Sequence, residues 1–205
     1  MINFKKYPKL TNIDIPSATR LTNTNFFNAF NNMQNLRSVN LPNGISNLNN
    51  AFINCVNLTS FSIGMSEVID MSQAYRNCKN LTGPSVCGPN VTNMHGAYRS
   101  CANITSAVCG PNVTNMSQAY AGGHNITIAV CGPKVIDMSA AYQETGVVTA
   151  VCGPNVTSMS ATYRNCKNLT TTVCGDSVTN MHSTYMGCVS LMDNAASCGP
   201  NVIDM

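Results

Sequence analysis

Hydrophobic and polar positions repeat along this chain with a period of 21–24 residues. The two clearest consecutive units are Val91–Asn112 (VTNMHGAYRSCANITSAVCGPN) and Val113–Lys134 (VTNMSQAYAGGHNITIAVCGPK). Tandem units of this length are typical of solenoids, in which each unit stacks on its neighbours to build one core. The pattern therefore predicts a single continuous solenoid domain over residues 23–205, preceded by a half repeat over residues 1–22 that serves as an N-terminal cap.

The first half of each unit has the spacing of a short helix. Met94, Ala97, Tyr98 and Cys101 follow the i, i+3, i+4, i+7 pattern that places apolar side chains on one helical face. A short polar residue precedes this pattern and can accept a hydrogen bond from a free backbone N–H, as a helix N-cap does. The predicted N-caps are Asn47, Asp70, Asn93, Asn115, Asp137, Ser158 and Asn180.

The second half of each unit has the pattern of a strand. Leu36-x-x-Val39-x-Leu41 fits the L-x-x-L-x-L core of a leucine-rich repeat, and Gly110-Pro111 later in the chain marks the turn back to the next unit. We therefore expect an α/β solenoid of about eight leucine-rich-repeat-like coils, each with a short helix and a short strand in a parallel sheet.

The eleven cysteines fall in two columns of the repeat, at positions that other units fill with apolar residues. We interpret them as small buried hydrophobes. Disulfides between stacked coils are the alternative, which the odd count and the gaps at Gly123 and Thr145 disfavour. One column is Cys55, Cys78, Cys101, Cys166 and Cys188, and the other is Cys87, Cys109, Cys131, Cys152, Cys174 and Cys198.

No arrangement of residues predicts a metal site, a cofactor or catalysis. The cysteines include no C-x-x-C pair, and ligands spread one per coil do not converge on a metal ion. His95, His124 and His182 have no acid or nucleophile at a spacing that indicates a triad. The repeated methionines occupy a core column. We therefore expect a protein that is not an enzyme.

Charged residues make up 9% of the chain and the net charge is +3, whereas about a quarter of the residues are charged in typical soluble proteins. Sparse positive charge argues against a nucleic-acid partner. The N-terminal MINFKKYPKL lacks the apolar run of a signal peptide, and no stretch is long enough to span a membrane. A surface with little charge indicates a protein that is part of an assembly or is locally tethered, and we expect an assembly that forms in a reducing cytoplasm.

A candidate binding face follows from the outward positions of the strands. These positions form an apolar stripe beside a hydroxyl stripe. A contiguous exposed apolar stripe marks a contact surface, although β-branched residues also simply favour strands. The candidate residues are Val108, Val130, Val151 and Val173 in one stripe and Thr105, Thr127, Thr149 and Thr170 in the other.

Two stretches carry a resemblance to a known family. Met71-Ser72-x-x-Tyr75-x-x-Cys78-x-x-Leu81 recurs from Met159 to Leu169. This pattern resembles the BspA-like leucine-rich repeats, including those of mycoplasma surface lipoproteins, although Tyr replaces Phe and CGPN replaces the usual acidic loop. The resemblance implies a surface-displayed solenoid that binds host proteins, matrix or other cells. Similar repeats also occur in bacteriophage structural proteins.

We expect first a non-catalytic solenoid for structural assembly and for protein or glycan binding, as a bacteriophage virion or fibre component. A bacterial or protist cell-surface adhesin is one alternative, and a binder of regular surfaces such as ice or polysaccharide is another. The sequence stops at Asp204-Met205, where a further helix is predicted to begin. We interpret this as an open C-terminal end, which implies a partner against it, a further domain outside this chain or head-to-tail stacking of copies, and we expect self-association or a larger assembly.

Overall fold

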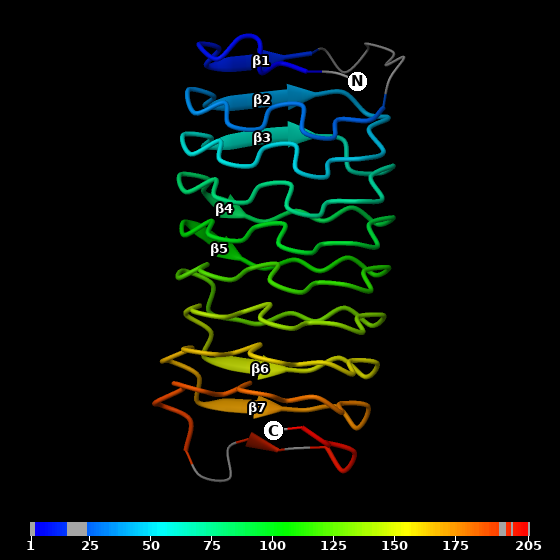
Figure 1. Ribbon diagram of the computed structural model, residues 1–205, viewed down its shortest axis with the longest axis vertical. Helices are drawn as coiled ribbons and strands as arrows, with labels where there is room; N and C mark the ends of the chain where they lie inside the picture. Colours follow the sequence, from blue (N-terminus) through cyan, green and yellow to red (C-terminus); the bar gives the residue numbers. More distant parts are fainter. Residues whose placement is uncertain (1–2, 16–23, 193–195, 198, 205) are drawn as a thin grey trace.

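The computed structural model describes residues 3–15, 24–192, 196–197 and 199–204. The chain winds into a stack of coils, with β1 at one end of the long axis and β8 at the other (Figure 1). The boundary predicted between residues 22 and 23 lies outside the described residues, as do Cys198 and Met205. No helix in the described part is long and apolar enough to cross a membrane.

One wall of the stack consists of short parallel strands. They form three separate sheets, with the strand orders β1-β2-β3, β4-β5 and β6-β7-β8. Neighbours pair in the order of the chain, for example Val39 with Phe61 and Val151 with Val173. The strands are β1 (Asn12–Asp14), β2 (Ser38–Leu41), β3 (Ser60–Ile63), β4 (Gly83–Pro84), β5 (Ile104–Ser106), β6 (Thr149–Val151), β7 (Thr171–Val173) and β8 (Ala196–Ser197).

A second ladder runs the length of the stack through one residue per coil. Parallel bridges join Asn25 to Asn47 and continue coil by coil to Asp204. The neighbouring backbone supports this ladder, because the N–H of Thr92 donates to the carbonyl of Ile69 and that of Thr114 donates to the carbonyl of Thr92, both at 2.9 Å. This column contains the polar residues that precede the predicted helices.

The predicted helices are wrong, because the described residues contain none. From Met94 to Ser100, the N–H groups of alternate residues donate to carbonyls of the next coil at 2.7–2.8 Å. The residues between them close turns, as when the N–H of Ala97 donates to the carbonyl of Met94 at 2.9 Å. The segment is therefore a wall of stacked turns, which we call the turn wall.

Left-handed backbone at two positions per coil explains why the segment does not become helical. Gly96 has φ of 58° and Ser100 has φ of 61°, whereas a helix requires a negative φ at each residue. With left-handed residues in the segment, alternate N–H groups point along the stack and donate to carbonyl groups of the next coil. Met94, Ala97, Tyr98 and Cys101 still face the core, so the helical spacing identified the buried face and misidentified the element.

The predicted N-caps bond to nearby backbone without capping a helix. The side-chain oxygens of Asp70 and Asp137 each accept the N–H of the residue two positions on, at 2.8 Å. Asn47, Asn93, Asn115 and Asn180 accept in the same way, at 2.8–3.0 Å. These are Asx turns, which mimic a backbone turn. Ser158 differs, because its hydroxyl bonds to the hydroxyl of Ser139 at 2.8 Å.

The core lies between these walls and consists of columns of equivalent side chains. Valine, methionine, alanine and leucine columns are almost fully buried from one coil to the next. An aromatic column runs beside them with ring centroids 4.7–6.1 Å apart and nearly parallel planes. Its members are Phe4, Phe30, Phe52, Tyr75, Tyr98, Tyr120, Tyr142, Tyr163 and Tyr185.

Candidate binding surface

The outer face of the strand wall carries exposed β-branched side chains. In β6 and β7 the side chains alternate, so that Ala150 and Thr172 are buried while Val151 and Val173 are 63% and 54% exposed. Because Val151 pairs directly with Val173, the two valines lie side by side on the surface. The predicted valine stripe is thus solvent-exposed where the strands are regular.

The exposed stripe widens in the middle of the stack. Val130 is 37% exposed, Val148 is 38% exposed and Ile128 is 62% exposed. We call Ile128, Val130, Val148, Val151 and Val173 the sheet-face patch. Residues 126–130, 147–151 and 169–173 contain no charged side chain, so the patch is apolar and uncharged. Val108, one coil before Val130, is 37% exposed.

The predicted threonine stripe is split between two columns. The N–H of Val148 donates to the carbonyl of Thr127, and the N–H of Thr170 donates to the carbonyl of Val148, both at 2.9 Å. Val148 therefore occupies the place expected for Thr149. Thr149 instead bridges Ile128 and pairs with Thr171 in the adjacent column. Thr105 and Thr127 are exposed as expected, but the hydroxyl ladder is interrupted.

Tyrosine hydroxyls satisfy the backbone where the strand wall loses its regular pairing. The Tyr142 hydroxyl accepts the N–H of Val130 at 2.9 Å and donates to its carbonyl at 2.6 Å. Tyr98 does the same for Val86, and Tyr120 does so for Val108. Each hydroxyl takes the place of a neighbouring strand as a partner of this backbone, and the N–H of Val108 also donates to the hydroxyl of Ser85 at 2.9 Å. These tyrosines therefore position the valine stripe from inside.

The first cysteine column is buried and hydrogen-bonded. The thiol of Cys101 donates to the carbonyl of Tyr75 in the preceding coil at 3.0 Å, and that of Cys55 donates to the carbonyl of Phe30 at 3.1 Å. Burial raises the pKa of the Cys55 and Cys101 thiols to about 12. Cys78, Cys166 and Cys188 donate in the same way at 2.9–3.2 Å.

The second cysteine column ends the strands and is less deeply buried. Burial raises the pKa of the Cys109 and Cys131 thiols to about 11. Cys152 is 9% exposed, and Cys174 hydrogen-bonds to the Tyr185 hydroxyl at 3.1 Å. Cys87 is half-buried. Thiols whose pKa is raised stay protonated at neutral pH, so they are poor nucleophiles and metal ligands.

The histidines lie in different coils and have different partners. His95 Nδ1 bonds to the hydroxyl of Ser117 at 2.8 Å, and His124 Nδ1 bonds to the backbone carbonyl of Glu144 at 2.9 Å. His182 faces Asp204 at 3.7 Å. Within the described part of the chain, no three His, Cys, Asp or Glu side chains are grouped so that they could hold a metal ion.

Sequence reasoning did not predict a notch at the corner where the turn wall leads into the strand wall. It has a volume of about 560 Å³ and is lined by polar residues on three successive coils. The signal was present in the chain, because the unit beginning at Val135 has one residue fewer than its neighbours.

Comparison with solved structures supports the solenoid fold. A leucine rich cell surface protein from Faecalibacterium prausnitzii matches with a TM-score of 0.67 and 21% identity, over 81% of this chain and 48% of that one. The T. pallidum Leucine Rich Repeat protein matches with a TM-score of 0.54 and 16% identity, over 91% of this chain and 80% of that one. At these identities the shared property is the fold, and the chain spans about half the length of the first protein.

The sequence comparison identifies the family. No curated protein sequence matches the chain significantly. The family model described as the BspA type Leucine rich repeat region matches residues 2–127 in six copies, which is more than half of the 205 residues. The chain therefore belongs to the BspA-type leucine-rich repeat family.

Proposed function

We propose that this chain is a protein-binding, adhesion-type module of a surface-displayed protein, and that the sheet-face patch is its contact surface. The observation that supports this is the clustering of exposed β-branched side chains on one wall, with Val151 63% and Ile128 62% exposed. Contiguous exposed apolar surface mostly marks a contact site. We infer surface display from membership of the family and from the F. prausnitzii cell surface protein, which shares the fold.

The patch has the physical properties of an interface core. Desolvation of its valine and isoleucine side chains is favourable, at about 25 cal/mol for each Å² removed from water. No charged group has to lose its hydration. The residues lie on paired strands and on backbone held by Tyr142, so little conformational entropy is lost on binding.

Charge insertion into the patch tests this function. Fluorescently labelled protein is applied to cultured cells and to immobilised extracellular-matrix extract, with Val151→Lys and Val173→Lys as variants. The matched control is Ile69→Lys, because Ile69 and Val173 are both 54% exposed. We expect at least a tenfold loss of binding for the patch variants and none for the control. Equal losses in all three, or no binding by the parent protein, would reject the proposal.

Self-association through the same patch is the second candidate, because an uncharged apolar patch can also bury itself against a second copy. The mass in reducing solution is measured across a dilution series. A stable oligomer that dissociates in Val151→Lys supports assembly, and a monomer supports capture of a different partner. The comparisons provide no support for a bacteriophage component, so assembly is proposed without a virion.

A further inference from the structure

The corner notch lies in a short coil that departs from the repeat. This coil has the single residue Gly146 where its neighbours have His124–Asn125 and Lys167–Asn168. A Cβ at position 146 would lie 2.4 Å from the carbonyl oxygen of His124, so only glycine permits this approach. The shortened corner leaves a depression of about 560 Å³ between the two longer corners.

Polar groups from three successive coils line this notch. Glu144, Thr145 and Gly146 come from the short coil, and His124 and Lys167 lie on the coils before and after it. His124 Nδ1 is engaged by the carbonyl of Glu144 at 2.9 Å, which fixes the ring. The backbone holds the corners together, because the N–H of Glu144 donates to the carbonyl of Arg164 at 2.8 Å.

Two side chains of the notch have unused hydrogen-bonding capacity. The equivalent corner residue Asn103 donates to the carbonyl of Lys79 in the preceding coil at 3.0 Å. Asn168 makes no such bond within the described residues. Lys167 is exposed and has no hydrogen bond or ion pair to the described part of the chain. Both therefore face the notch with free donors.

Positive charge gathers along the same edge of the stack. The corner segments 76–80, 99–103, 121–125, 143–146 and 164–168 contain five of the eleven Lys and Arg residues and one carboxylate, that of Glu144. These segments stack directly on one another ahead of the strands (Figure 1). We call Arg76, Lys79, Arg99, Arg164 and Lys167 the basic edge.

We propose that the notch and the basic edge together bind an acidic polysaccharide, with a sugar ring seated in the notch. Lysine and arginine would pair with its sulfate or carboxylate groups. The amides of Asn165 and Asn168 would bond to sugar hydroxyls, of which each can donate and accept. This site lies at the corner next to the strand wall, uses none of the residues of the sheet-face patch, and extends the proposed function to a second ligand.

The carboxylate of Glu144 favours a polysaccharide over an acidic peptide. It lies beside Lys167 of the following coil, so a run of adjacent carboxylates would meet a like charge there. A sugar presents hydroxyls between its acidic groups, and a hydroxyl can donate to that carboxylate. The notch also lacks the aromatic or large aliphatic anchor that dominates binding between proteins.

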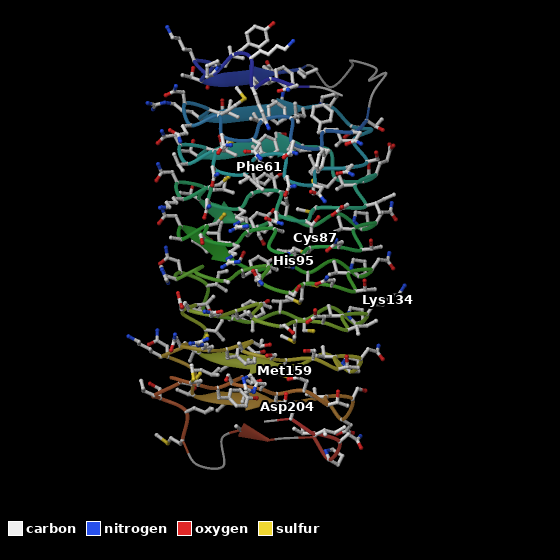
Figure 2. The ribbon with its side chains drawn as sticks, viewed as in Figure 1. Phe61, Cys87, His95, Lys134, Met159 and Asp204 are labelled. Atoms are coloured by element: carbon white, nitrogen blue, oxygen red, sulfur yellow. The ribbon has the colours of Figure 1, made fainter. Side chains whose placement is uncertain are left out.

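Heparin and polygalacturonate are the probes, one sulfated and the other carboxylated, and dextran is the neutral reference. Binding is measured by calorimetry on the whole chain and on Lys167→Gln and Lys79→Gln. The matched control is Lys134→Gln, which removes the same charge at the opposite edge of the stack (Figure 2). We expect a loss of about tenfold in affinity for each basic-edge variant and no change for the control.

Binding of heparin alone, polygalacturonate alone or both would support the site and identify the acidic group. If Lys134→Gln and Lys167→Gln lost affinity equally, binding would depend only on the net charge of the protein, and the proposal would be overturned. The proposal would also be overturned if dextran or polyglutamate bound as tightly as the acidic polysaccharides, or if neither heparin nor polygalacturonate bound. Val151→Lys in the sheet-face patch should leave this binding intact, so the two proposed functions can fail separately.

Discussion

Individual tyrosines have different energetic roles although they occupy one column. The Tyr142 hydroxyl partners both the N–H and the carbonyl of Val130. The hydroxyls of Tyr75 and Tyr163 are buried and have no partner among the described residues. Burying a hydroxyl without a hydrogen bond has a free-energy cost. The same residue type should therefore stabilise one coil and slightly destabilise another.

Replacement by phenylalanine tests this difference at the residue scale. We expect Tyr142→Phe to lower the free energy of unfolding by about 1–3 kcal/mol, because two backbone groups lose their partner. Tyr163→Phe, which keeps the ring in the stack, should be neutral or stabilising by about 1 kcal/mol. Urea denaturation of both variants measures the two values. Equal destabilisation would show that the hydroxyls do not distinguish the coils.

Single residues also decide how closely the binding face could be predicted. The exposed valines of β6 and β7 follow from strand alternation, which the sequence displays. Counting 14 residues from the start of each unit predicts the wrong column for Thr149, because the unit that begins at Val135 lacks one residue before this threonine. The hydrogen bonds of Val148 to both neighbouring coils and the pairing of Thr149 with Thr171 reveal the shift. The same missing residue creates the notch, which the repeat pattern therefore did not predict.

At the scale of elements, a helix and a wall of stacked turns share the same apolar spacing, and left-handed backbone distinguishes them. Ala140 and Ala161 have φ of 53° in this wall. Alanine is the best helix former, but in left-handed backbone it is strained by about 1–2 kcal/mol. Glycine carries no such penalty there. The effect of glycine at these positions therefore has opposite signs in a helix and in the turn wall.

We predict that Ala140→Gly raises the free energy of unfolding by about 1 kcal/mol, because it relieves the left-handed strain. A helix would instead lose about 1 kcal/mol. Thermal unfolding followed by circular dichroism measures the sign. Gly96→Ala, in which glycine already occupies the equivalent position with φ of 58°, is the reverse test and should destabilise the fold.

The strands and the solenoid were predictable, and the turn wall was not, for a physical reason. Spacing identifies which residues face the core, and Met94, Ala97, Tyr98 and Cys101 do so. The same spacing arises from two successive turns. Ser100 and Gln118, neither of which is glycine, adopt left-handed backbone, so composition alone could not mark the turns. The bonds between coils provide the stabilisation that overrides local preference.

At the scale of the whole molecule, each coil contacts the coils directly before and after it. Hydrogen bonds of the turn wall join residue positions about one period apart, such as Tyr98 with Ala119 and Tyr120 with Ala141. Stability in such a stack is approximately a sum over coils and the interfaces between them. The length of the stack should therefore be adjustable in whole coils.

Excision of residues 113–134, which joins Asn112 to Val135, tests this modularity. All columns keep their register, so we expect a folded protein whose urea m-value falls by about one-tenth, in proportion to the 22 residues removed from 205. Excision of residues 113–123 removes half a coil and should prevent cooperative folding, because strands would then stack on turns. A cooperative transition in the half-coil variant would contradict the stacking account.

The aromatic column makes the fold optically unusual. The chain has no tryptophan, so tyrosine is its strongest intrinsic fluorophore. Tyr75, Tyr98, Tyr120, Tyr142, Tyr163 and Tyr185 lie in nearly parallel planes 5.1–6.1 Å from their neighbours. At this separation, excitation of one ring passes readily to the next. Depolarised ultraviolet emission and a strong near-ultraviolet dichroism band would then report, without any label, whether the coils are in contact.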